Sequence, residues 1–220
     1  MTTHPLARFV TGIVAVLAGF TTFALAGPPL VCHPIDIGSA KTLPWVDLNY
    51  RKGDGGFDLN SLPKATLAIL DSDSSVLVHM ETLRRATIFA RQDQQVAKEL
   101  LVRLHARAEN SAGNNALAWF DAGYLAETYK QWLGSPNPAG NVDGYAWVTK
   151  AIQMRGQDPE MEFAAALITL TSPERDHQGH VQRAMAGAKT DAPLAQNLTS
   201  RFRNQTISAL LTTGEEGLNK

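Results

Sequence analysis

Cysteine is nearly absent from this chain of 220 residues, which contains Cys32 and no other thiol. A single thiol cannot close a disulfide within the chain, and no second cysteine completes a Cys-x-x-Cys zinc or redox motif. The chain also lacks a Cys-x-x-Cys-His haem-attachment motif, a glycine-rich phosphate loop and a His-Glu-x-x-His zinc motif. No short motif therefore identifies a reaction, and we expect no cofactor.

An excess of either charge is missing as well. Twenty Lys and Arg residues stand against 21 Asp and Glu residues, which gives a net charge of −1. Domains that bind nucleic acid usually carry a clear basic excess, so we expect no nucleic-acid partner. The hydrophobic fraction of 44% is that of an ordinary globular domain with a core of its own.

Only one long apolar run is present, and it lies at the N-terminus. Residues 9–26 contain no charged side chain, follow Arg8 and end in Ala24-Leu25-Ala26. A basic start, an apolar middle and a small-residue exit are the plan of a secretory signal peptide. We expect cleavage before Gly27 and export to the periplasm or the extracellular space, with no membrane contact beyond the leader. An uncleaved anchor is the alternative, because the run is slightly long for a leader.

Residues 27–64 have no helical periodicity and are rich in proline, glycine and aspartate. This segment nevertheless carries many large apolar side chains, among them Leu30, Val31, Ile35, Leu43 and Trp45. A disordered tail would contain fewer of them. We expect an extended N-terminal segment that packs across the rest of the protein.

Residues 65–213 read as an all-α domain, followed by a short tail over 214–220. Apolar side chains recur every three or four positions within residues 76–91, 93–108 and 116–133. We expect seven or eight helices and no strand.

Three polar signals mark expected helix starts in the second half of this domain. Asp158 precedes Pro159, the Thr171–Glu174 spacing is that of a capping box, and Asp191 precedes an apolar stripe.

The spacing of the apolar stripes suggests a repeat. Comparable apolar stripes begin at Leu83, Trp119 and Phe163, and a second helix follows each of them. The middle unit carries six residues at motif positions: Trp119, Ala122, Gly123, Ala126, Gly144 and Ala151. On these residues the chain over 76–189 resembles a tetratricopeptide-type helical repeat. The resemblance implies a solenoid of stacked helical hairpins, and an irregular helical bundle is the alternative architecture.

The function that fits this architecture is an exported helical scaffold that binds a protein or peptide partner, rather than an enzyme. Four residues are candidates for contact with that partner: Arg84, Arg85, Trp119 and Tyr124. Arginine often recognises a carboxylate, although Arg84 and Arg85 could instead pair with Glu81 and expose their charged ends. Aromatic residues crowd two neighbouring helices, so we expect at least one ring at the surface.

The alternative function is an exported metal-binding or thiol-dependent enzyme centred on Cys32 and His33. Such a centre needs further ligands or a base from distant histidines. The remaining candidates for that role are His79, His105, His177 and His180. His177 and His180 lie three residues apart, so a helix would place them on one face, either to bind one metal ion or as a polar surface.

Cys32 also has a simpler interpretation. Val31 and Ile35 flank it, and cysteine packs in protein cores as a small hydrophobic residue. Lipid attachment near the leader and a disulfide between two chains are further alternatives. We expect a buried thiol that helps to hold the N-terminal segment against the helices.

Overall fold

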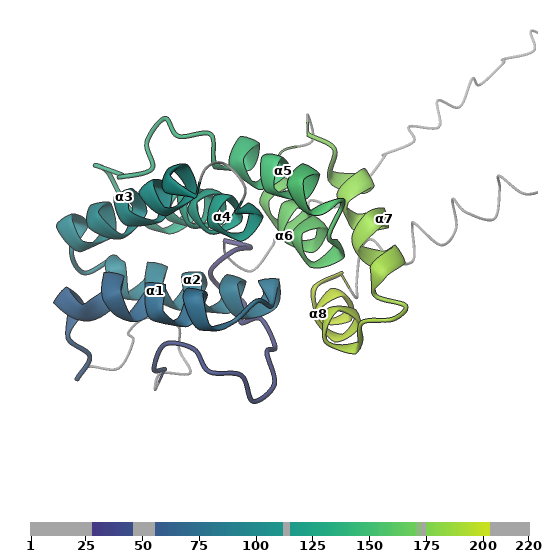
Figure 1. The fold of residues 1–220 in the computed structure, drawn as a ribbon, viewed down its shortest axis with the longest axis horizontal. Coiled ribbons are helices and arrows are strands. Elements are labelled where there is room, and N and C mark those ends of the chain that lie inside the picture. The colour runs from purple at the N-terminus through teal and green to yellow at the C-terminus, as the bar shows by residue number, and fades with distance from the viewer. Residues whose placement is uncertain (1–27, 46–55, 112–114, 171, 173–174, 203–220) are drawn as a thin grey trace, which may run out of the picture.

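The structure is a computed structural model that describes residues 28–45, 56–111, 115–170, 172 and 175–202. Within these residues it contains eight α-helices, one short 3₁₀ helix and no strand, so the all-α prediction is confirmed. The elements are η1 (Leu59–Ser61), α1 (Leu62–Ser72), α2 (Val76–Ala90), α3 (Gln94–Asn110), α4 (Ala116–Trp132), α5 (Gly144–Arg155), α6 (Pro159–Thr169), α7 (His177–Gly187) and α8 (Ala192–Phe202). Figure 1 shows α1–α4 at one end of the molecule and α5–α8 at the other.

Aspartate side chains fix several helix starts. Asp158 accepts hydrogen bonds from the backbone N–H groups of the first turn of α6, and Asp191 does the same for α8. The start of α7 differs from the prediction, since Asp176 caps it through the N–H of Gly179 at 3.1 Å. Residues 171, 173 and 174 of the expected capping box lie outside the described residues.

The helical domain begins slightly earlier than its expected start at residue 65. The first helix, α1, starts at Leu62, and Pro63 lies in its first turn. Proline suits this position because the N–H that it lacks would have no partner within the helix.

Helices α4 and α5 form an antiparallel hairpin that is closed by two glycines. A Cβ atom on Gly123 would lie 2.5 Å from the carbonyl oxygen of Gly144, and the reverse distance is also 2.5 Å. The two backbones can approach this closely only because neither residue has a side chain. Further along the hairpin, the rings of Trp119 and Trp147 lie 6.0 Å apart.

Helices α6 and α7 form a second antiparallel hairpin. Thr169 at the end of α6 contacts His177 at the start of α7, with 3.2 Å between Oγ1 and Nδ1. Gly187 at the end of α7 lies against Pro159 at the start of α6. Consecutive helices therefore pair in this half of the chain, as Figure 1 shows for α4–α5 and α6–α7.

The core is centred on α2, α4 and α6. Every residue of α2 except Arg85 is buried, and residues 161–169 of α6 are buried without a gap. Because nearly every residue of α2 is buried, other parts of the chain must cover this helix on all sides. α2 packs against α1, α3, α4 and α6, and residues 28–45 cover part of what remains.

Residues 28–45, called the strap from here on, run without regular structure from the middle of the molecule around α2 (Figure 1). Leu30, Val31, Ile35 and Leu43 are each between 0% and 3% exposed. Trp45 packs edge-on against Phe89 of α2 with 6.4 Å between ring centres. The strap is therefore part of the folded core.

Several sequence-based expectations fall outside the described residues. These are the leader over 1–26, residues 46–55, the chain beyond 202 and the tail over 214–220. Among the helices that the structure does describe, none combines the length and the apolar character needed to cross a membrane.

Candidate functional site

Glu81 is the centre of the contacts between the strap and the helices. Its carboxylate lies on α2 and is 1% exposed. Oε2 accepts a hydrogen bond from the backbone N–H of Ile35 at 2.9 Å and from Arg84 Nε at 2.7 Å. Oε1 accepts from Arg84 Nη2 at 2.8 Å and from Arg85 Nε at 2.7 Å. Burial alone would raise the pKa of Glu81, but the two arginines and the Ile35 N–H hold it below its ordinary value.

Arg84 and Arg85, two of the expected partner contacts, bind the strap. Arg84 is 1% exposed, and its Nη1 donates to the carbonyl oxygen of Val31 at 3.0 Å. Arg85 is 21% exposed, and its Nη1 donates to the carbonyl oxygen of Leu43 at 2.6 Å. Both arginines pair with Glu81, as the alternative interpretation expected, but the end of Arg84 is buried and that of Arg85 only partly exposed, because each donates to a carbonyl oxygen of the same chain.

Helix α8 holds another part of the strap. Asn197 is 1% exposed and forms two hydrogen bonds with the main chain of Asp36. Its Oδ1 accepts from the N–H and its Nδ2 donates to the carbonyl oxygen, both at 2.8 Å. Arg201 donates to the carbonyl oxygens of His33 at 2.8 Å and Pro29 at 3.3 Å. Burial lowers the pKa of Arg201 to about 10. The helices thus hold the strap largely through its main chain.

Cys32 is half-buried, so it is not the fully buried thiol that we expected. Burial raises the pKa of this thiol, although the guanidinium groups of Arg84 and Arg201 oppose that effect. His33 is half-buried beside it, and burial followed by the charge of Arg201 lowers its pKa. No group of three or more His, Cys, Asp or Glu side chains in the described ranges is arranged to hold a metal ion.

His79 and His105 lie in settings separate from Cys32. His79 is fully buried, with Nδ1 2.6 Å from Asp121 Oδ1 and Nε2 3.1 Å from the carbonyl oxygen of Asp73. Burial alone would lower the pKa of His79, but Asp121 raises it above its ordinary value. His105 stacks on Trp147 with 4.4 Å between ring centres.

His177 and His180 both lie on α7, as expected, but their rings contact different groups. The Nδ1 atom of His177 lies 3.1 Å from the carbonyl oxygen of Ala166. His180 contacts Glu162 and Tyr145. Both nitrogens of His180 are therefore engaged by neighbouring side chains, and the structure does not bring the two histidines together as a pair of metal ligands.

The expected aromatic contacts are mostly internal. Tyr124 is fully buried and is therefore not placed to touch a partner, and Trp119 is 9% exposed. Trp132, Tyr145 and Trp147 are half-buried. None of these rings is fully exposed, but the half-buried ring of Tyr145 reaches the surface at the edge of a pocket.

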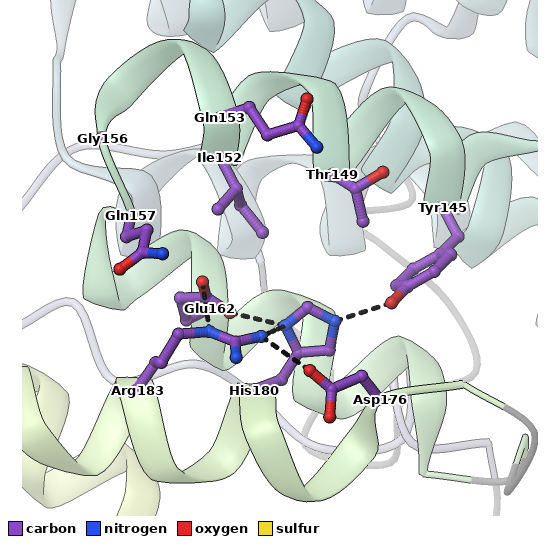
Figure 2. A pocket seen from close by; sticks show the side chains of 10 residues that line it. All are labelled: Tyr145, Thr149, Ile152, Gln153, Gly156, Gln157, Glu162, Asp176, His180 and Arg183. Atoms are coloured by element: carbon purple, nitrogen blue, oxygen red, sulfur yellow. Dashed lines mark hydrogen bonds and ion pairs between the residues drawn. The ribbon is translucent and has the colours of Figure 1, made fainter.

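An open pocket of about 690 Å³ lies between α5, α6 and α7 (Figure 2). Its walls carry Tyr145, Thr149, Ile152 and Gln153 from α5 and His180 and Arg183 from α7, with Glu162 of α6 between them. The volume falls within the roughly 300–1,000 Å³ of typical ligand sites. We call this site the α5–α7 pocket.

Glu162 anchors the polar side of the α5–α7 pocket and is 1% exposed. Its Oε2 lies 2.5 Å from His180 Nδ1, and its Oε1 accepts from Arg183 Nε at 2.7 Å. The Nε2 atom of His180 lies 2.7 Å from the hydroxyl of Tyr145. Burial alone would raise the pKa of Glu162, but its hydrogen bonds to His180 and Arg183 hold it below its ordinary value.

These contacts assign the tautomer of a neutral His180. An ionised Glu162 can only accept, so Nδ1 of the imidazole must carry the proton. Nε2 is then the acceptor for the hydroxyl proton of Tyr145. Burial raises the pKa of Tyr145, which agrees with a phenol that keeps its proton and donates it. Arg183 Nη2, 3.0 Å from Nδ1, is therefore a close charged neighbour of the ring rather than a donor to it.

The mouth of the α5–α7 pocket is more exposed. The carboxylate of Asp176 is 62% exposed and lies 3.2 Å from Arg183 Nη2. The guanidinium of Arg175 lies over the ring of Tyr145, 4.4 Å from its centre. The entrance thus carries a negative and a positive side chain, Asp176 and Arg175, whereas the carboxylate at the floor, Glu162, is already paired.

The end of α5 turns two amide side chains toward the α5–α7 pocket. Gly156 has φ 72° and Gln157 has φ 67°, a left-handed conformation that is uncommon for a residue with a side chain. The N–H of Gln157 donates to the carbonyl oxygen of Ile152 at 3.0 Å and so closes the helix end. Gln153 and Gln157 line the pocket across from Arg183 (Figure 2).

Sequence analysis named His180 only as a possible metal or thiol-centre residue, and it did not single out Glu162, Arg183 or the two glutamines. One available signal was a glutamate inside the otherwise apolar stretch of α6, since such a carboxylate must find partners when the helix is buried. No protein-family model, no curated protein and no solved structure matches this chain.

Proposed function

We propose that this protein is an exported helical scaffold that binds an extended peptide segment of a partner protein in the α5–α7 pocket. The observation that carries the proposal is the way in which α2 and α8 of the same protein hold the strap. There, guanidinium groups donate to carbonyl oxygens, and the amide of Asn197 pairs with the N–H and carbonyl of one residue. This chemistry recognises a main chain rather than particular side chains.

The α5–α7 pocket offers the same types of group without a main chain across them. The side-chain amides of Gln153 and Gln157 are exposed and have no hydrogen-bond partner among the described residues. Each of these amides can both donate to a carbonyl and accept from an N–H, as Asn197 does with Asp36. Ile152 adds an apolar contact beside them.

The paired network at the floor makes the α5–α7 pocket rigid. Glu162 fixes the ring of His180 and the guanidinium of Arg183 at the same time. Side chains that are held before a ligand arrives lose less entropy when it binds. This preorganisation supports a binding site.

The proposal includes the expected architecture and destination of the protein. The hairpins α4–α5 and α6–α7 would be successive units of a tetratricopeptide-type array, and the pocket would lie where the two units meet. The leader over 1–26 would direct export and be removed before Gly27. N-terminal sequencing of the protein from the exported fraction tests the destination independently of binding.

Panning of a random-peptide phage library against the full chain tests the binding function. Selected peptides should bind wild-type protein and lose about tenfold or more in affinity for the double variant Gln153→Ala/Gln157→Ala, because two main-chain hydrogen bonds are removed. Gln178→Ala is the matched control, since Gln178 is an exposed glutamine of α7 that does not line the pocket.

Two results would contradict the proposal. One is a library that yields no binder above the level found with unfolded protein. The other is a set of binders whose affinity is the same for wild type and for the double glutamine variant. Thermal unfolding of each variant establishes that the fold is retained before its affinity is compared.

A further inference from the structure

A second feature lies on α3, α4 and α5, away from the strap and the α5–α7 pocket. The rings of His105, Trp119 and Trp147 meet there, one from each helix. His105 stacks on Trp147 at 4.4 Å with an interplanar angle of 12°. Trp119 stands nearly perpendicular to both rings, at 5.9 Å from His105 and 6.0 Å from Trp147.

A cation already occupies the face of Trp119. The Nζ atom of Lys150 lies 3.4 Å from the centre of the indole ring. Lys150 is an exposed residue, and its ammonium forms no ion pair or hydrogen bond with any side chain among the described residues. The ring face, and not a carboxylate, therefore holds this ammonium group. Tryptophan is the aromatic residue with the strongest attraction for cations.

Trp119 contacts its neighbours through its aromatic ring and not through its indole N–H group. Its Nε1 atom is buried and has no hydrogen-bond partner in the part of the chain that the structure describes. A buried indole N–H usually finds an acceptor, so its lack of one here is unusual. Trp119 is only 9% exposed, and Lys150 lies over the face that would otherwise accept a ligand.

We propose that the Trp119 face, bordered by His105 and Trp147, is a binding site for a methylated ammonium group, with Lys150 as a tethered occupant that such a ligand displaces. A quaternary ammonium has no N–H groups to hydrate, so it leaves water more readily than the ammonium of a lysine. Its methyl groups also contact the ring over a larger apolar area. This inference concerns a different surface from the proposed peptide site and does not depend on it.

Choline chloride is the probe, added to the full chain while tryptophan fluorescence is recorded. Lys150→Ala should bind choline at least about fivefold more tightly than wild type, because the competing ammonium is gone. Lys150→Arg is the matched control and should resemble wild type, since a guanidinium still covers the ring. The uncharged isostere 3,3-dimethylbutanol should bind neither protein, and sodium chloride corrects for ionic strength.

A further variant locates the site on the ring. Adding Trp119→Leu to Lys150→Ala should abolish the choline response, while urea unfolding of the double variant reports whether the fold remains. Phosphocholine vesicles and a trimethyl-lysine peptide then distinguish a lipid headgroup from a modified protein as the source of the group. A Lys150→Ala protein that shows no saturable response, or that responds equally to the uncharged isostere, would overturn the proposal.

Discussion

The strap contacts and the α5–α7 pocket share one feature, a carboxylate that is 1% exposed and pairs with two nitrogen-bearing side chains. Glu81 holds Arg84 and Arg85, and Glu162 holds His180 and Arg183. The two sites differ in what lies beyond the pair. At Glu81 the guanidinium groups also donate hydrogen bonds to carbonyl oxygens of the strap. Arg183, in contrast, is 35% exposed and borders an open pocket.

This difference suggests different roles for the two clusters: the Glu81 cluster stabilises the fold, and the Glu162 cluster is available for binding. At Glu81 the strap's main chain occupies the donors of the charged side chains, so these donors are not available to a partner. Where no described segment covers the cluster, as at Glu162, similar groups remain available at the wall of a cavity. A buried charge with an incomplete set of partners is costly, so the covered cluster should dominate stability and the open one should dominate binding.

Deletion of residues 28–45 is the strongest test of the covered site. It removes four side chains that are at most 3% exposed, each contributing about 1.5–3 kcal/mol through burial, and it also removes the acceptors of two buried or half-buried arginines. We expect a chain that no longer unfolds cooperatively in urea. An unchanged unfolding midpoint would show that the strap is a tail and that the comparison with the pocket is mistaken.

The substitution Glu81→Gln tests the covered cluster without deleting any residue. One buried and one half-buried guanidinium group would lose their counter-charge, and we expect a loss of about 3–5 kcal/mol in the free energy of unfolding. Glu99→Gln is the control because Glu99 pairs with Arg103 at the surface, where the side chains are 42% and 51% exposed. That change should stay within about 1 kcal/mol. Equal effects at the two positions would mean that burial of the pair is unimportant.

Much of the fold could be predicted from residues that act locally. The start of α6 at Pro159 follows from a capping aspartate and a proline in adjacent positions, and both act within one turn. The packing of the strap could also be predicted, because apolar side chains in a proline-rich segment need a surface to cover. The start of α7 could not, since several polar residues precede it and the sequence alone does not show that Asp176 is the one that caps the helix.

The sites depended on partners that are far away in the sequence. Arg84 and Glu81 were visible as neighbours on a helix, but nothing local shows that the acceptor for Arg84 is Val31, 53 residues earlier. Glu162 meets His180 and Arg183 only because α6 and α7 pair in this register. Periodicity predicts which face of a helix is buried, but it does not predict which polar groups meet inside.

The smallest expected effect concerns pH and compares Glu162 with its neighbour Glu160. The folded state lowers the pKa of Glu162 below 4.5, so this group contributes stability that is present above pH 4.5 and is lost as the pH falls through the folded value. The folded state raises the pKa of Glu160, through burial and then the charge of Asp191, so its contribution has the opposite sign. It favours folding at low pH and declines as the pH rises through its folded pKa.

Urea midpoints measured across the acidic range should therefore change in opposite directions for the two variants. Glu162→Gln should flatten the rise of stability with pH, and Glu160→Gln should steepen it. The amide oxygen introduced by Glu160→Gln can still accept from the N–H groups of Val76 and Leu77, which keeps the start of α2 capped in that variant. Two slopes that shift in the same direction would show that the Glu162 network is not a charged one, and the α5–α7 pocket would then lack the rigid ionic floor on which its comparison with the strap rests.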